Sequence, residues 1–456
     1  MDRYSRFLIG ATLCAFSFLT AAAPAPYLEL RGAASESSRV IVEFHGTPLA
    51  AGRGAVQASR HDELFARFRA DLAGGRVAAL SAGRQATPRI AHEYRTVFLG
   101  AAVEASDADV SRIRALPYVR AVHADKIMRV SASPATAPLD TVTDARAKVN
   151  ASSLGTSGAG IVVAVIDTGI DYLHASLGGG FGAGFKVAGG HDFVNDDGDP
   201  MDDNGHGTHV AGTIAASATD LIGVAPDATL IAYKVLSGEG NGATSGIIAA
   251  LERCADPNGD GDPSDHVHVA NLSLGGPGDA EDPVSRAVDH AVAAGIVVVV
   301  AAGNDGATAS IGSPGTALDA LTVAAIDDDG NMTEFSSRGP SPRLLGFKPD
   351  VAAPGFQIVS ARVGGGTAAL NGTSMATPHV AGVAALLRKL HPEWTPAEVK
   401  AAITSSATEI AAGPFARGAG RADARAANES KLLLSKAGLS FGIRPSRTGT
   451  SAETQT

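Results

Sequence analysis

From about residue 139 onward, short and nearly continuous apolar runs alternate with glycine turns and with longer stretches of helical period. Strands that are buried on both faces and alternate with helices predict a parallel, doubly wound α/β sheet. The predicted strands, rich in valine and isoleucine, are Ile161–Ile166, Leu230–Leu236, His268–Leu274, Ile296–Ala301 and Leu321–Ile326. The predicted helices between them include His209–Ala218, Thr244–Cys254 and Asp282–Ala294.

Residues 39–130 carry a different and more charged pattern, which predicts a separate small domain. Val40–Phe44 alternates like a strand, and Asp62–Leu72 places apolar side chains on one helical face. If one further strand lies within Pro88–Tyr94, the order is β-α-β-β-α-β, which is that of a ferredoxin-like α+β unit. The remaining predicted elements are a strand at Thr96–Val103, a helix at Asp107–Leu116 and a strand at Tyr118–Asp125.

Residues 1–23 have the pattern of a secretory signal peptide, with Arg3 and Arg6 ahead of the apolar run Phe7–Leu19 and small residues at the end. The run is too short for a comfortable membrane span, although a retained signal anchor is the alternative. We therefore expect a secreted, extracellular protein without membrane attachment. Export would leave Cys254 as the only cysteine, so no intrachain disulfide is expected. A buried apolar role for this cysteine is favoured over a reactive thiol.

Composition narrows the class of protein. The length of 456 residues predicts two or three domains, and 45% hydrophobic residues with 54 glycines suit a compact core with many tight turns. The formal net charge of −10, without any block of lysines or arginines, argues against a nucleic-acid partner. We expect a monomer.

Four polar residues are placed where a doubly wound sheet binds ligands, beyond the carboxyl ends of its strands. Asp167 and Asn304 each follow a predicted strand, and His206 and Ser374 each open a predicted helix. Ser374 precedes a small-residue and leucine-rich run, and Pro378 suits a first helical turn. A carboxylate, an imidazole, an amide and a hydroxyl are the parts of a hydrolytic nucleophile system. Taken alone, the spacing around Ser374 favours an ordinary helix cap over a nucleophile.

Three sequence blocks resemble the active-site blocks of the subtilisin-like serine proteases, in that family's order of Asp, His and Ser. The blocks are Val165–Gly169, Gly205–Thr213 and Gly372–His379. The resemblance covers residues 139–428, the expected catalytic domain. Residues 39–130 resemble the family's inhibitory propeptide, most clearly at Leu116–Asp125.

The resemblance implies a role for each polar residue. Ser374 would be the nucleophile and His206 the general base, and Asp167 would hold the imidazole in the useful tautomer. Asn304 would donate its amide to the oxyanion beside the Ser374 N–H group. The resemblance makes His209 structural. Zinc binding by His206 and His209 is disfavoured, because the two histidines are spaced i, i+3 and no glutamate stands beside the first, as it would in a zinc-protease helix.

The resemblance also implies how substrate is held. Asn271–Gly276 and Gly238–Gly242 would flank an extended peptide and pair with its backbone, which explains a broad specificity for proteins and peptides. Gly303, with Ala301 and Ala302, would line a roomy apolar pocket for the residue before the cut. The residues in these segments expected to contact substrate are Ser273, Leu274, Gly275 and Gly240. The domain at 39–130 would be the chain's own inhibitor, released by self-cleavage in the linker 131–138.

Catalysis by these residues needs no cofactor, but two acidic runs are candidates for structural calcium. Asp256–Asp265 has oxygen ligands at alternate positions followed by a glycine, like the opening of a calcium loop, but its twelfth position is Val267 rather than glutamate. A solvated turn is the alternative. Asp192–Asp203 either binds an ion or forms the approach to His206.

The C-terminal residues 429–456 depart from the family's simple ending. Gly438–Gly442 is typical of the first strand of an appended β domain, and 443–456 are expected to be disordered. Two alternatives to a protease remain: a subtilase-like binding protein that has lost catalysis, and a peptide ligase or transacylase that forms the same acyl-enzyme.

Overall fold

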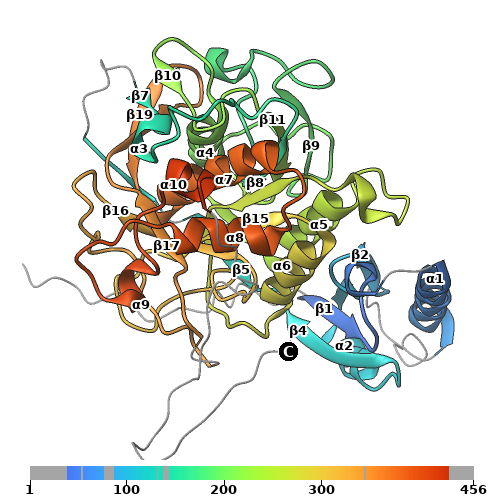
Figure 1. The fold of residues 1–456 in the computed structure, drawn as a ribbon. Helices are drawn as coiled ribbons and strands as arrows, with labels where there is room; N and C mark the ends of the chain where they lie inside the picture. The colour runs from blue at the N-terminus through green and yellow to red at the C-terminus, as the bar shows by residue number, and fades with distance from the viewer. Residues whose placement is uncertain are drawn as a thin grey trace, which may run out of the picture. The chain divides into compact units, whose positions relative to one another are not determined.

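The computed structural model describes residues 38–52, 55–75, 87–130, 132–136, 143–343 and 346–430 (Figure 1). The predicted signal peptide and the predicted strand at 438–442 lie outside these ranges. Among the described helices, none is both long enough and apolar enough to cross a membrane.

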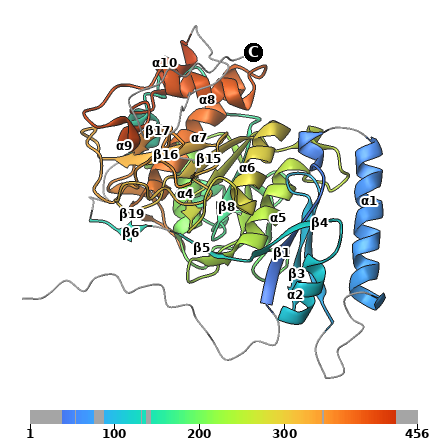
Figure 2. The ribbon, with the colours of Figure 1, turned by 90° about the horizontal axis from the view of Figure 1, so that it is seen from below.

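The first domain has the predicted ferredoxin-like order, and the strand expected within Pro88–Tyr94 is present as β2. Its four strands form an antiparallel sheet in the order β2-β3-β1-β4, with α1 and α2 on one face (Figure 2). The elements are β1 (Ser38–Phe44), α1 (Ala55–Ala70), β2 (Arg89–Tyr94), β3 (Gly100–Ala105), α2 (Asp107–Arg114) and β4 (Val119–Ala124).

The sheet of the first domain buries both of its faces, which follows from the alternation along β1. Val40 and Val42 point into a core with Phe65 and Phe68 of α1. Ile41, between them, points the other way and belongs to a core that also contains residues of the second domain. Successive strand residues face opposite sides of a sheet, so one face of this domain is left apolar for its partner domain to cover.

The second domain is built on a parallel seven-stranded sheet, as predicted, in the order β17-β16-β15-β13-β8-β11-β9. The predictions missed the two edge strands, β9 and β17, because β9 contains two glycines and β17 is mostly alanine and proline. The strands are β8 (Val162–Asp167), β9 (Val187–Asp192), β11 (Thr229–Lys234), β13 (Val269–Leu272), β15 (Val297–Ala301), β16 (Leu321–Ile326) and β17 (Val351–Pro354).

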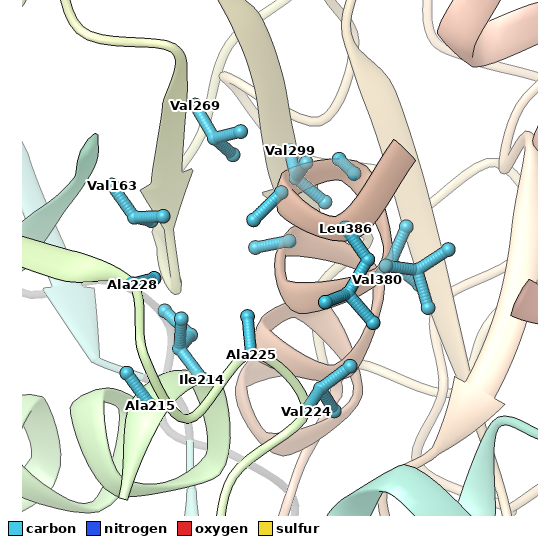
Figure 3. Close-up of a cluster of buried hydrophobic side chains, with 14 of the residues drawn as sticks. Val163, Ile214, Ala215, Val224, Ala225, Ala228, Val269, Val299, Val380 and Leu386 are labelled. Carbon is cyan, nitrogen blue, oxygen red and sulfur yellow. The ribbon is translucent and has the colours of Figure 1, made fainter. Parts of the chain in front are cut away.

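Helices cover both faces of this sheet (Figures 1 and 2). On one face, α4 (His206–Ala215) and α7 (Thr373–Leu390) pack against strand residues such as Val163. Figure 3 shows side chains of these two helices gathered beside valines of β8, β13 and β15. On the other face, α5 (Thr244–Ala255) and α6 (Pro283–Ala294) pack against residues such as Ile166. The sheet is therefore doubly wound.

The order of strands reverses beside β8. From β8 the chain continues to β9 and β11 on one side of β8, and only then to β13 on the other side. Such a switch point opens a crevice beyond the carboxyl ends of the strands. Asp167 is the last residue of β8 and lies at this crevice.

Smaller elements complete the fold. Two three-stranded sheets, β12-β5-β14 and β18-β19-β6, each take one strand from the segment 127–134. Their strands are β12 (Asn241–Ala243), β5 (Ile127–Val130), β14 (Leu274–Gly275), β18 (Ile358–Ala361), β19 (Thr367–Asn371) and β6 (Ser133–Pro134). The other elements are η1 (Leu49–Ala51), η2 (Asp71–Gly75), β7 (Thr143–Asp144), α3 (Ala145–Lys148), η3 (Ala175–Leu177), β10 (Leu221–Ile222), η4 (Pro263–Asp265), α8 (Pro396–Ser405), α9 (Pro414–Arg417) and α10 (Ala424–Asn428).

Candidate active site

Asp167 and His206 meet at the crevice. The Nδ1 atom of His206, the first residue of α4, lies 2.7 Å from Oδ1 of Asp167, and both side chains are buried. Because a carboxylate only accepts, this contact places the imidazole proton on Nδ1 and leaves Nε2 with its lone pair. Nε2 makes no hydrogen bond within the described part of the chain. The pair is arranged as a base with its orienting carboxylate.

Asp202 holds the start of the helix that carries His206. This role was missed in the sequence analysis, because Asp192–Asp203 was interpreted either as an ion-binding site or as the approach to His206. The carboxylate is 3% exposed and accepts five hydrogen bonds of 2.6 to 2.9 Å. The donors are the N–H groups of Asn204, Gly205 and Thr208 and the hydroxyls of Thr168 and Thr208. Since Thr168 follows Asp167, the same carboxylate ties both members of the pair together.

Ser374 is the second residue of α7, close to where a helix start was predicted. Its hydroxyl donates to the Ser273 carbonyl at 3.0 Å, and the Ser273 hydroxyl donates to the Ser374 carbonyl at 2.9 Å. The interpretation of Pro378 was wrong: it lies in the second turn, not the first. Because proline has no N–H group, the Ser374 carbonyl, four residues earlier, lacks its usual helical donor. The Ser273 hydroxyl donates to this carbonyl instead.

Asn304 lies just beyond β15, and its amide is oriented by Thr373. The Asn304 Oδ1 atom accepts from the Thr373 N–H at 2.9 Å and from the Thr373 hydroxyl at 2.8 Å. The Thr373 hydroxyl also accepts from the Gly303 N–H at 3.2 Å. Asn304, Gly303 and the start of α7 therefore form one connected unit beside Ser374. The pocket expected at Ala301–Gly303 stays a prediction.

Strand β5, which follows the first domain, lies between the two segments expected to flank a substrate. Val130 pairs with Leu274 and Arg129 with Gly275 on one side, and the Val130 N–H donates to the Gly240 carbonyl at 3.0 Å on the other. Gly240 has φ +75°, and a Cβ atom there would lie 2.5 Å from the Val130 side chain. The backbone edges at 240–243 and 274–275 thus hold an extended strand.

A second edge, which sequence reasoning missed, holds the chain at β19, the strand that runs into α7. Ser133 and Pro134 in β6 pair with Asn371 and Leu370 of β19, and the Ala135 N–H donates to the Ala369 carbonyl at 3.0 Å. Asn371 stands three residues before the serine. Residues 127–130 and 133–135 are therefore held by two separate edges, one of which follows Ser273 and the other of which runs into α7.

Side chains of the second domain anchor the first. Glu252 on α5 accepts hydrogen bonds of 2.7 to 3.1 Å from four successive N–H groups, those of residues 95–98. Arg286 on α6 pairs with the buried Glu43 of β1 at 2.7 Å. The Tyr94 hydroxyl donates to the Ser245 carbonyl at 2.9 Å. These polar contacts surround the shared apolar core and fix the orientation of the first domain.

His209 is placed as a structural residue, as expected. Its Nε2 atom bonds the Ile358 carbonyl at 2.9 Å, and burial lowers the pKa of its ring to about 3. A histidine that stays neutral and donates to a main-chain carbonyl packs α4 against β18 and is not arranged as a metal ligand.

Calcium binding at Asp256–Asp265 stays a prediction. The Asp256 carboxylate accepts N–H groups of Gly259, Asp260 and Gly261 within its own loop. In the described ranges no group of three or more His, Cys, Asp or Glu side chains is placed to hold a metal ion. Cys254, just before the loop, is buried, and burial raises the pKa of its thiol.

Comparison with known proteins agrees with this geometry. The profile of the Subtilase family matches residues 158–433, and that of Peptidase inhibitor I9 matches residues 39–131. Serine protease AprX of Bacillus subtilis (strain 168) is 41% identical over 296 residues, which cover 58% of this chain and 65% of AprX, just under two thirds. An alkaline protease of Alkalihalobacillus alcalophilus is 37% identical over 340 residues, 74% of this chain and 81% of that protein. Subtilisin BL of Lederbergia lenta is 42% identical over 262 residues, 57% of this chain and 88% of that protein.

Proposed function

The chain belongs to the subtilase family of serine proteases and carries an I9-type inhibitor domain, and we propose that it is a secreted zymogen which cuts its own linker and then acts as an endopeptidase. The observation that carries the proposal is the Asp167–His206 contact of 2.7 Å, together with the backbone edges at 240–243 and 274–275 that hold an extended strand. The second of these edges follows Ser273, which exchanges two hydrogen bonds with Ser374. Secretion is supported by the pattern of residues 1–23.

Catalysis would begin with the hydroxyl of Ser374 turning from the Ser273 carbonyl toward Nε2 of His206. The hydroxyl oxygen attacks the scissile carbonyl while Nε2 takes its proton, and Asp167 stabilises the resulting imidazolium. The imidazolium then gives the proton to the leaving amine. Water deacylates the enzyme by the same route, with His206 again acting as base.

The oxyanion would be stabilised by the Ser374 N–H and by the Asn304 amide. The start of α7 adds the positive end of a helix dipole. The bonds from Thr373 to Oδ1 fix the plane of the Asn304 amide, which supports a preorganised donor.

The self-cleaved bond would lie between Val130 and Ser133. Among the described residues, Val130 is the last that pairs with β14 and Ser133 is the first that pairs with β19, which supports a cut in the short stretch between them. A mature chain would start within residues 131–133.

Mass spectrometry of purified wild type beside Ser374→Ala tests the proposal. We expect the wild type to be cut between Val130 and Ser133 and the variant to stay whole. A fluorophosphonate that labels active serines should modify the wild type at Ser374 alone. An identical cut in both proteins, or a wild type that neither labels nor hydrolyses peptides, would exclude the proposed protease.

A further inference from the structure

Lys234 is a buried lysine, 1% exposed, at the carboxyl end of β11. It pairs in register with Asp167 of β8 on one side and with Asp192 of β9 on the other. Leu230 of the same strand belongs to the core on the α4 side of the sheet. Because alternate residues of a strand share a face, Lys234 projects toward α4, the helix that His206 opens.

The Lys234 ammonium group bonds three segments at once. Its Nζ atom donates to the Thr168 carbonyl at 2.8 Å, to the Leu236 carbonyl at 3.2 Å and to the Asp203 carboxylate. A lysine has three N–H donors, so each of them has an acceptor here. Thr168 follows the carboxylate of the candidate pair, Asp203 precedes the imidazole by three residues, and Leu236 leads into the edge at 240–243. One side chain therefore ties together the parts that must be aligned for hydrolysis.

The charge of Lys234 lies among carboxylates that face the imidazole. Asp192 is committed to its own turn and Asp202 to the five donors described above. The Asp203 side chain is 58% exposed, so solvent weakens its charge, whereas the buried ammonium is screened much less. The charge of Lys234 therefore opposes the gain of a proton by His206. The charged and titratable groups around Lys234 are Asp167 of β8, Asp192 of β9, Asp202, Asp203 and His206 at the start of α4, and Glu239 in the turn after β11.

We propose that Lys234 is a positioning residue that holds the carboxylate, the imidazole and the substrate edge in one arrangement, and that its buried charge keeps His206 unprotonated toward lower pH. The inference rests on the proposed protease function and deepens it, because the first step requires an unprotonated His206. Lys234 thus helps to set the acid side of the activity profile.

Titration of the His206 ring by NMR measures this effect without catalysis. In the full chain with Ser374→Ala, Lys234→Met should move the titration midpoint upward by about one pH unit, as expected for the loss of a unit charge about 10 Å away at an effective dielectric constant of about 20. In the processed enzyme, the acid limb of kcat/KM should move in the same direction by the same amount. The plateau should fall about tenfold or more, because displaced reacting groups lose rate.

Lys348→Met is the matched control. Lys348 is also buried and donates to the Ala320 carbonyl at 2.9 Å and to Asp350 at 2.7 Å, but it precedes β17, at the amino ends of the parallel strands. Both substitutions remove a buried ammonium group and should weaken folding, whereas only Lys234→Met should move the His206 titration. An equal shift in the two variants, or no shift with Lys234→Met, would overturn the inference.

Asp203→Asn is the second variant, should Lys234→Met fail to fold. It removes an exposed counter-charge and leaves the buried ammonium group in place, so the His206 titration should move to lower pH. A midpoint at the wild-type value would contradict the role of the Lys234 charge. The two measurements also keep the two proposals apart. Shifted titrations in a protein that hydrolyses no peptide would exclude the protease alone, whereas an active protease with unmoved titrations would exclude the role of Lys234 alone.

Discussion

Glu252→Ala should release the first domain from the second without damage to the catalytic residues. The carboxylate satisfies the four N–H groups of residues 95–98. A hydrogen bond to a charged acceptor contributes about 1.5 to 3 kcal/mol, but water reaches the freed groups once the loop opens, so the net loss is smaller than the sum. We expect about 3 kcal/mol, which is about 150-fold in the docking equilibrium.

Hydrogen exchange measures this loss directly. In a Ser374→Ala background, which keeps the linker intact, amides 95–98 should exchange about 150-fold faster when Glu252 is replaced, because exchange follows the free energy of local opening. Glu239→Ala is the matched control, since that glutamate is exposed and bonds the Ser237 hydroxyl in its own turn. Unchanged protection of amides 95–98, or equal loosening of the β8–β13 sheet core, would refute the reasoning.

Three further predictions concern single residues. Burial against Phe193 lowers the pKa of His92 to about 4, against about 6.5 when undocked. The docked state thus binds fewer protons than the undocked state, so docking should be undiminished above pH 6.5 and about 30-fold weaker at pH 5. Gel filtration of the cleaved protein should show that the first domain is released at acid pH, and His92→Gln should make this release less dependent on pH. Gly240→Ala, at φ +75° and against Val130, should raise KM for peptides tenfold or more by roughly 1–3 kcal/mol of strain, and a wild-type KM would contradict the proposal that the edge at 240–243 binds substrate. Asp202→Asn should lower kcat and cost about 2 to 3 kcal/mol of unfolding free energy in urea, and an unaltered kcat would deny it a positioning role.

The parallel sheet could be predicted where the sequence is dominated by branched apolar residues. Val297–Ala301 is buried throughout and forms β15 almost as expected. The edge strand β9, Val187–Asp192, contains Gly189 and Gly190 and has no such signal. A Cβ at Gly190 would lie 2.0 Å from a carbonyl oxygen of β11, so the fold requires glycine at this position. Because glycine has a low strand propensity, the strand could not be recognised from the sequence.

The candidate site could be predicted only in part, for a similar reason. Asp167 and Ser374 stand at a strand end and a helix start, which local pattern reveals. Asp202 stands in an acidic run whose composition suggests a solvated loop, and its role emerges only when five donors from separate segments converge on it. Strand β19 contains two alanines and an asparagine, and it pairs with a strand more than 200 residues earlier, which a local pattern does not reveal.

The two sides of the proposed cut are held by contacts of very different extent. This difference would explain how one cut could produce an inhibited enzyme that later becomes active. On the side before the cut, β5 continues a whole domain that shares an apolar core with α5 and α6 and is anchored by Glu252 and Arg286. On the other side, β6 contributes two paired residues with exposed side chains. After the proposed cleavage, the short segment could leave β19 at little cost in free energy. The first domain stays until its anchors fail, so its departure, rather than the cut, would set the onset of activity. Glu252→Ala should therefore shorten the delay between self-cleavage and the appearance of peptidase activity, and it should leave the rate of self-cleavage unchanged.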